Sequence, residues 1–222
     1  MKTSERLRAD YSYLWEKLFQ HPFVLEMGDG SLPLDKFQFY VKQDYYFLIQ
    51  YSRVLAIAAA KARTLYLMGQ FSDLLIETIN TEMDLHRSFA EQFSISNESL
   101  EYVEPAPVTE AYTDYLLRVA YEGSLLDIIA TLLPCQWGYS ETGKHLKVNG
   151  NLSSSNKYLP WIEMYSSKEF EVFVENLRNH LDDLVDQAGA TTYKRVSNHF
   201  LTATSYEYLF WDMSYNLLAW PV

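Results

Sequence analysis

The chain has 222 residues, of which only 8 are glycine and 7 proline, while apolar residues make up 48%. This length fits one hydrophobic core, and the scarcity of turn-forming residues argues against a β-sandwich, a β-barrel or a disordered chain. Eighteen Lys and Arg against 29 Asp and Glu give a net charge of −11, which would repel a nucleic-acid backbone. We expect one all-α domain over residues 1–222 that binds no nucleic acid.

The polarity of the chain and its cysteine content indicate the compartment. The first six residues are polar, and no apolar run approaches the ~20 residues that a membrane span requires. A single cysteine cannot form an internal disulfide. These features predict a soluble cytoplasmic protein that makes no membrane contact.

Apolar residues at helical spacing, together with signals for helix ends, predict a series of helices. The predicted helices cover residues 4–20, 33–68, 72–93, 109–121, 124–147, 160–165, 166–188 and 191–219. Pro22 ends the first because the residue before a proline leaves helical dihedrals, and Gly69 is the expected stop of the second. Ser166 followed by Glu169 is typical of a capping box at a helix start, and Gly189 is expected to close that helix.

Two segments without a helical pattern separate these helices. One is the acidic, proline-containing stretch 97–107, and the other is the polar loop 149–156. The chain shows no internal repeat and no heptad run, so the predicted architecture is a single bundle of antiparallel helices.

Aromatic residues make up 16% of the chain and include 18 tyrosines. Most of these rings are expected to fill the core, but a buried tyrosine must place its hydroxyl on a partner. The surplus favours a polar, aromatic-walled pocket for a flat ligand.

Asp44, Phe47 and Tyr51 are spaced i, i+3 and i+7 within one predicted helix. This spacing places a carboxylate, a ring and a phenol on one stripe of the helix. One interpretation is a core stripe whose aspartate bonds a neighbouring group. The other is a ligand wall, in which the carboxylate accepts from an amino group and the ring stacks on the ligand.

The only cysteine, Cys135, follows a proline in the middle of a predicted helix. Pro134 cannot donate to the carbonyl of Ala130, so it leaves an acceptor beside the thiol and favours a kink. Tyr139 falls on the same face one turn later. A lone cysteine is commonly inert packing, and a catalytic thiol here would need activation from other helices.

Glu207 lies among apolar and aromatic residues of the last predicted helix. Loss of solvent would raise its pKa and make it a proton donor, or one of the many tyrosines would simply satisfy it.

His86 with Glu82 and Asp84 invites comparison with a metal site. Helical di-iron sites use Glu-x-x-His pairs, whereas Glu82 and His86 are four residues apart and no second motif is present. A structural hydrogen bond is therefore the favoured role of His86. The remaining histidines lack any pattern around them that is typical of haem ligation, and no metal or organic cofactor is predicted.

Taken together, these features resemble the TenA family, the thiaminase II or aminopyrimidine aminohydrolase group. The segments that carry the resemblance are 37–51, 61–62, 82–86, 134–139, 161–165 and 200–211. The block from Pro134 to Tyr139 is the most specific of them, and its Cys135 is similar to that of the cysteine-bearing branch.

The resemblance implies the all-α, haem-oxygenase-like bundle and a hydrolase. The implied reaction replaces the amine on the methylene of 4-amino-5-aminomethyl-2-methylpyrimidine by water, giving hydroxymethylpyrimidine for thiamin salvage. Thiamin itself would be cleaved similarly, with the thiazole as leaving group. The implied roles are nucleophile for Cys135, proton donor to a ring nitrogen for Glu207 and acceptor of the amino group for Asp44.

The resemblance also implies the walls of the site. Phe47 and Tyr165 would sandwich the pyrimidine, while Tyr51, Tyr112 and Tyr139 would position the thiol and the water. No metal or organic cofactor takes part in such a reaction.

The resemblance further implies a homotetramer. Aromatic residues near the C-terminus exceed what one small bundle buries, and exposed apolar patches mark subunit contacts. The residues concerned are Tyr208, Phe210, Trp211 and Trp220.

Two alternatives remain open from the sequence. A regulatory or partner protein with the same bundle would bind a pyrimidine without turnover. A redox enzyme of the same fold would use haem, a quinone precursor or a di-iron site.

Overall fold

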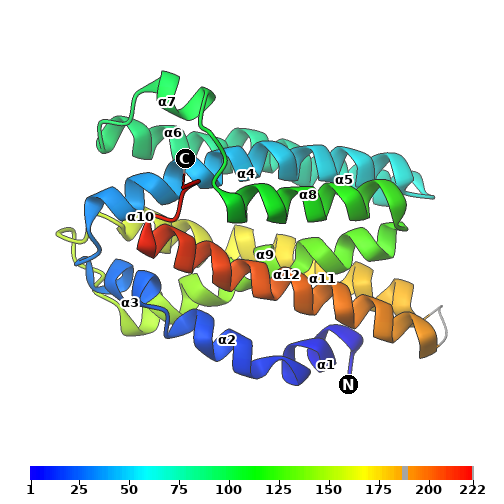
Figure 1. Ribbon diagram of the computed structural model, residues 1–222. Helices are drawn as coiled ribbons and strands as arrows, with labels where there is room; N and C mark the ends of the chain where they lie inside the picture. Colours follow the sequence, from blue (N-terminus) through cyan, green and yellow to red (C-terminus); the bar gives the residue numbers. More distant parts are fainter. Residues whose placement is uncertain (187–189, 222) are drawn as a thin grey trace. The chain divides into compact units, whose positions relative to one another are not determined.

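A computed structural model describes residues 1–186 and 190–221, and every regular element within these ranges is helical (Figure 1). The helices are α1 (Thr3–Asp10), α2 (Ser12–Phe19), α3 (Pro22–Asp29), α4 (Leu34–Lys61), α5 (Leu65–Glu77), α6 (Met83–Gln92), α7 (Asn97–Glu101), α8 (Pro107–Glu122), α9 (Leu125–Asn149), α10 (Leu159–Tyr165), α11 (Lys168–Asp186) and α12 (Ala190–Asn216). A π-helical segment, η1 (Thr78–Glu82), joins α5 to α6. The predicted all-α class is confirmed. No helix in the described ranges is long and apolar enough to cross a membrane.

The described residues form two compact units. Unit 1 contains Met1–Leu32 and Ile129–Tyr215, and unit 2 contains Pro33–Ile128 and the residues from Asn216 on. Helix α9 therefore begins in unit 2 and continues through unit 1. One domain over residues 1–222 stays a prediction.

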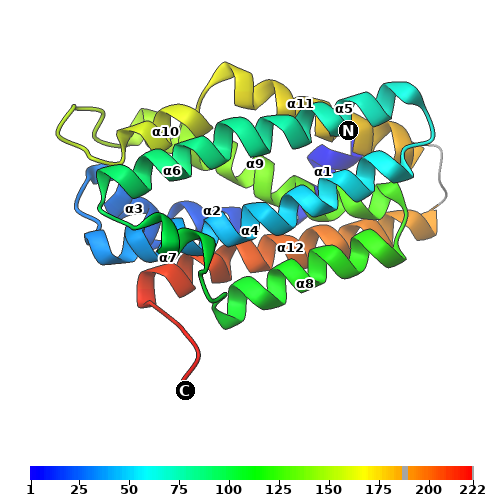
Figure 2. The same ribbon diagram turned by 90° about the horizontal axis from the view of Figure 1, so that it is seen from above.

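The long helix α4 organises unit 2. It contacts α5, α6, α7 and α8, and these neighbours lie beside it in two perpendicular views (Figure 2). Its buried positions recur three or four residues apart, as expected for a helix that turns one stripe to a core. They include Phe37, Tyr40, Val41, Asp44, Phe47, Leu48, Tyr51, Val54, Leu55 and Ala58.

The helix predicted over 4–20 is divided at Tyr11, which leaves helical dihedrals with φ −113° and ψ 21°. Tertiary contacts hold Tyr11 there: its hydroxyl shares a 2.6 Å hydrogen bond with Ser197 and its ring stacks on Phe200. The predicted end before Pro22 is confirmed. A further helix, α3, which the prediction omitted, starts at Pro22 itself and ends at Gly30, where φ is +87°.

The second predicted helix ends earlier than expected, at Lys61, and Gly69 is not its stop. Thr64 begins α5, because its side chain accepts the backbone N–H of Leu67 at 3.2 Å. Gly69 lies inside α5, with open space around the position of a Cβ atom. The segment 97–107 is not wholly irregular either, since Ser96 caps the short helix α7.

The C-terminal half follows the prediction closely, with two differences and one expectation that stays untested. The cap of α11 is Ser167 rather than Ser166, since the Ser167 hydroxyl accepts the N–H of Phe170 at 3.1 Å. The expected end of that helix at residues 188 and 189 lies outside the described residues. Helix α12 ends at Asn216 instead of 219, because Leu217 has a φ of +53°.

The expected loop 149–156 is present, and Asn156 anchors it. The buried amide of Asn156 donates to the backbone oxygens of Met27, Gly28 and Asn151 at 3.0–3.3 Å. The loop is thereby tied to α3 within unit 1.

The aromatic residues expected to be exposed near the C-terminus are mostly not exposed. Phe210 and Trp211 are buried in unit 1, where Trp211 stacks on Phe23 with ring centroids 5.1 Å apart. Tyr208 is half-buried against His21. Trp220 alone of the four is exposed, at 46%.

Candidate functional site

Helix α4 presents Asp44, Phe47 and Tyr51 on one buried stripe, as their spacing predicted. The ring of Phe47 stacks with that of Tyr51, with centroids 5.8 Å apart, and lies 5.1 Å from that of Tyr112 on α8. Unit 2 thus brings four of the predicted site residues onto two adjacent helices.

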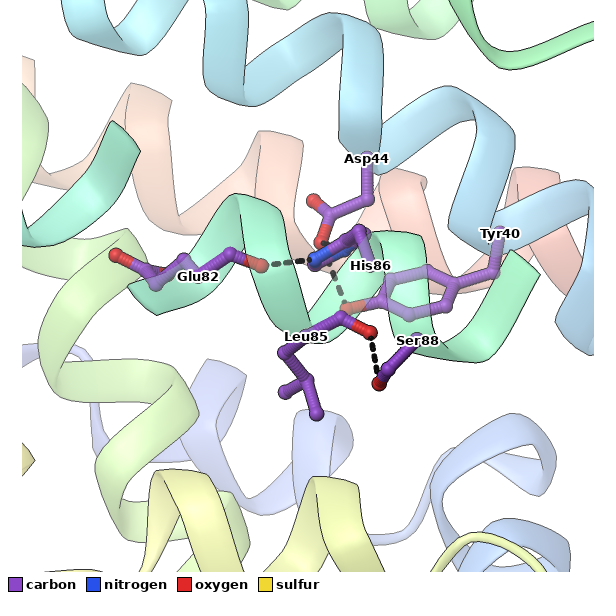
Figure 3. A network of polar contacts seen from close by, with 6 residues as sticks. All are labelled: Tyr40, Asp44, Glu82, Leu85, His86 and Ser88. Atoms are coloured by element: carbon purple, nitrogen blue, oxygen red, sulfur yellow. Dashed lines mark hydrogen bonds and ion pairs between the residues drawn. The ribbon is translucent and has the colours of Figure 1, made fainter. Parts of the chain in front are cut away.

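Asp44 belongs to a buried hydrogen-bond network that connects α4 with α6 (Figure 3). The hydroxyl of Tyr40, one turn earlier on α4, donates to Oδ2 of Asp44 at 2.9 Å. Nε2 of His86 lies 2.7 Å from the same Oδ2, and Nδ1 of His86 lies 2.8 Å from the backbone oxygen of Glu82. Among the described residues, no group donates to Oδ1. The hydrogen-bonding role expected of His86 is confirmed, and its partner is the predicted ligand-binding carboxylate.

The environment of His86 favours its charged form. Complete burial lowers the pKa of this imidazole, but the hydrogen bond and the charge of Asp44 outweigh burial, with help from Glu82. The net effect raises the pKa of His86 above its ordinary value of 6.5. The pair is a buried contact between the imidazole of His86 and the carboxyl group of Asp44, with Nε2 and Oδ2 2.7 Å apart.

Unit 1 holds the other four predicted site residues. Cys135 is a buried thiol on α9, one residue after Pro134, which the helix accommodates in its interior. Tyr139 lies one turn further along α9. Its ring packs edge-on against Tyr165 of α10, with centroids 4.9 Å apart.

Two tryptophans extend this aromatic cluster. Trp161 of α10 lies 4.6 Å from Tyr165, and Trp211 of α12 stacks on Tyr139 at 5.2 Å between centroids. All of these rings are buried, so the region around Tyr139 and Tyr165 is an aromatic wall formed by three helices.

Glu207 lies on α12, four residues before Trp211, and is buried with 4% exposure. Its helical neighbours Ala203 and Phe210 are buried too. The burial expected from the sequence is therefore confirmed.

Sequence reasoning missed several residues of these clusters. Tyr40 could have been found, because a tyrosine four residues before Asp44 lies on the same face of a helix. Trp161 and Trp211 lay within segments that carry the family resemblance, but nothing in their spacing linked them to Tyr139. No group of three or more His, Cys, Asp or Glu side chains in the described part of the chain could hold a metal ion.

Comparison with known proteins identifies the family. The family model described as TENA/THI-4/PQQC matches residues 8–217. The chain belongs to this family. A relative named aminopyrimidine aminohydrolase, from Halalkalibacterium halodurans, is 45% identical over 93% of this chain and 92% of its own length.

Solved structures of the same family and fold agree. A protein of Silicibacter sp. TM1040, described as a TenA family transcription regulator, is 33% identical and superimposes with a TM-score of 0.89 over 96% of both chains. A domain of unknown function with a heme oxygenase-like fold, from Shewanella denitrificans, gives a TM-score of 0.74 at 13% identity, over 96% of this chain and 92% of that one. The haem-oxygenase-like fold expected for the family is thereby confirmed for this chain.

Proposed function

We propose that this protein is an aminopyrimidine aminohydrolase of thiamin salvage. It replaces the amine on the methylene of 4-amino-5-aminomethyl-2-methylpyrimidine by water, and it also cleaves thiamin, with the thiazole as leaving group. The observation that carries the proposal is the 45% identity, over 93% of the chain, with a protein named for this activity. The presence of a thiol, a carboxyl and a carboxylate in buried positions supports it.

Direct displacement at the methylene carbon is slow, and addition of a thiolate to the ring removes this difficulty. The sulfur of Cys135 forms a bond to a ring carbon, and the adjacent ring nitrogen takes a proton from Glu207. The ring electrons then expel the amine, which leaves as ammonia with the proton given up by the thiol, and an exocyclic methylene forms. The oxygen of water adds to that methylene, the C–S bond breaks, the sulfur takes the proton released by the water, and the ring nitrogen returns its proton to Glu207.

Asp44 binds the substrate in this scheme rather than reacting with it. Its carboxylate accepts from the exocyclic amino group, and Phe47 and Tyr165 stack on the two faces of the ring. Asp44 and Phe47 lie in unit 2, and Cys135, Tyr165 and Glu207 lie in unit 1.

Three tyrosines complete the proposed site. Tyr51, Tyr112 and Tyr139 position the thiol and the attacking water. The contact of Tyr51 and Tyr112 with Phe47, and of Tyr139 with Tyr165, supports this assignment, because each hydroxyl-bearing ring touches a proposed wall of the pyrimidine site.

A second candidate function is a regulatory protein that binds the pyrimidine without turnover. The description of the Silicibacter structure as a transcription regulator favours it. The net charge of −11 argues against direct contact with DNA, and the candidate nucleophile and acid have no use in a protein that only binds. Release of ammonia from the aminopyrimidine is expected of the hydrolase and not of a protein that only binds the pyrimidine.

The test of the proposal is Cys135→Ser, which replaces a soft nucleophile by a hydroxyl that scarcely ionises. We expect turnover to fall at least ~100-fold, equivalent to about 3 kcal/mol in the activation barrier. Ammonia release under saturating substrate measures the loss.

Ser140→Ala is a matched control for this variant. Ser140 is buried on α9 like Cys135, and its hydroxyl has no hydrogen-bond partner among the described residues. Its removal should leave turnover within a few-fold of the parent. Near-native rates in Cys135→Ser would exclude covalent catalysis by the thiol.

A further inference from the structure

We infer that His86 and Tyr40 are positioning residues, which fix the Asp44 carboxylate as an anion with Oδ1 open to the amino group of the substrate. The inference rests on the proposed function, and it adds how the binding residue is made selective for an amino group. Neither residue touches substrate in this assignment; both act through Asp44.

The geometry assigns different tasks to the two carboxylate oxygens. Tyr40 and His86 approach Oδ2 from different helices, at 2.9 and 2.7 Å, so this oxygen accepts two hydrogen bonds inside the protein (Figure 3). No described residue donates to Oδ1. The carboxylate is thus held by one oxygen, and the other oxygen remains an acceptor.

The partners of the imidazole indicate its charge without reference to any titration. Nδ1 faces the backbone oxygen of Glu82, which can only accept a hydrogen bond. Nε2 faces Oδ2, which is also an acceptor while Asp44 is ionised. With Asp44 ionised, both ring nitrogens donate, and a histidine that donates twice is an imidazolium.

The groups around His86 are consistent with a cation. Asp44 and Tyr40 face it from α4, and Glu82 faces it from η1. A buried ion left without its partner is strongly destabilised, so His86 and Asp44 each hold the other in the charged form. The raised pKa of His86 agrees with this arrangement.

The local backbone sets His86 at this position. Segment η1 forms one wide π-helical turn immediately before α6, and it contacts both α4 and α6. Such turns are found frequently at functional sites, because the extra residue shifts the side chains that follow. His86 occupies the first turn of α6 after this shift and is fully buried.

The consequence for recognition is selectivity between an amino and an oxo group on the ring. An ionised Oδ1 can only accept, so it favours the N–H of a 4-amino group and repels the oxygen of a 4-oxo group. A buried acceptor facing an acceptor loses about 10- to 100-fold in affinity. Without the cation at His86, Asp44 can take up a proton and donate it to an oxo group.

The first experiment uses the protein without substrate and therefore does not depend on the proposed reaction. Nitrogen NMR of the histidine rings, with His86 assigned by its disappearance in His86→Gln, should show both nitrogens protonated at pH 7.5. A neutral tautomer, with one nitrogen bare, would overturn the inference.

The second experiment compares variants in steady-state hydrolysis across pH. In His86→Gln we expect KM for the aminopyrimidine to rise about 10- to 100-fold, with a smaller change in kcat. The acid limb of kcat/KM should move to higher pH, and inhibition by the 4-oxo analogue should strengthen relative to the parent. Tyr40→Phe removes one neutral donor, so it should raise KM without moving the acid limb.

His145→Gln is the matched control. His145 lies on α9 in unit 1, stacked on Phe19, and belongs to no part of the network. It should leave KM, the pH profile and the discrimination unchanged. If His86→Gln behaves like this control, the positioning role is refuted, and if it fails to fold, the KM and pH profile of Tyr40→Phe decide the question. Absence of turnover in the parent would refute the proposed function while leaving the NMR result to stand.

Discussion

Individual side chains in this protein gain their chemical roles from the loss of solvent around them. A buried carboxylate is costly unless a partner compensates it, and Asp44 is compensated by His86, which is 42 residues away in sequence. The helical spacing of Asp44, Phe47 and Tyr51 was enough to predict their shared stripe. It could not reveal His86 as the partner, because contacts between helices have no period in the sequence.

Glu207 offers a test of the proposed acid. The proposed role requires a carboxyl that gives a proton to a ring nitrogen, and Glu207 is a buried carboxyl on α12. Glu207→Gln should retain the fold and pyrimidine binding, while the chemical step slows by ~100-fold or more. Single-turnover rates across pH should also lose the alkaline limb that belongs to this group.

Glu163→Gln serves as the control for charge loss, since Glu163 is an exposed carboxylate of α10 in the same unit. Its pH profile should match that of the parent. If Glu207→Gln also matches the parent, Glu207 is a core carboxylate without a role in the reaction.

Among the sequence signals for helix ends, those that act only on neighbouring residues predicted the ends correctly. Pro22 ended the first helical segment as predicted, because its effect on the preceding residue needs no tertiary contact. Gly69 failed as a stop because a glycine costs an exposed helix only ~1 kcal/mol. The helix ends at Lys61 instead. The ammonium group of Lys61 donates to the backbone oxygens of Tyr121 and Gly123, which are distant in sequence.

The start of α3 provides a prediction about pH. Nδ1 of His21 accepts the N–H of Phe23 at 3.1 Å, so the neutral imidazole caps the helix. Burial lowers the pKa of His21 below 6.5, and the charge of Asp212, 3.8 Å away, only partly opposes this. As pH falls below 6.5, the unfolded chain therefore binds the proton first, and the free energy of unfolding decreases.

Urea denaturation between pH 8 and 5 measures this decrease, and His21→Asn isolates it. Asparagine caps a helix without titrating. Between pH 8 and 5, the free energy of unfolding of the variant should therefore decrease by about 1 kcal/mol less than that of the parent. Burial also lowers the pKa of His180, but His180 is present in both proteins, so its contribution to the pH dependence cancels in the comparison. His86 acts in the opposite sense, since its raised pKa removes stability only as pH rises above 6.5. Equal slopes in parent and variant would contradict the capping role.

For the whole molecule, composition predicted the fold class but not where the exposed apolar surface lies. The aromatic residues of α12 were expected outside, yet Trp211 is enclosed by Phe23 and Tyr139, which are distant in sequence. Five of the large exposed apolar side chains of unit 2 instead lie together on α5 and η1. They are Leu65, Tyr66, Met68, Ile76 and Ile79.

We propose that the protein is a homotetramer, as the family resemblance implies, and that the face of α5 takes part in its contacts. Met68 and Ile76 follow Leu65 by 3 and 11 residues, which places these three side chains along one stripe of α5, and Ile79 follows on η1. A stripe of this kind is typical of a subunit contact, since water disfavours contiguous apolar surface. Light scattering should give four times the 25.9 kDa mass of the chain.

The double variant Leu65→Glu, Ile76→Glu tests the location of the contact. Both side chains are exposed in the single chain, at 84% and 56%, so charges there should leave its fold intact and shift the mass toward smaller assemblies. Val148→Glu is the control, because Val148 is equally exposed, at 82%, near the end of α9 in unit 1. A parent that scatters as a 25.9 kDa species refutes the tetramer, whereas a double variant that keeps the parent's larger mass removes α5 from the interface.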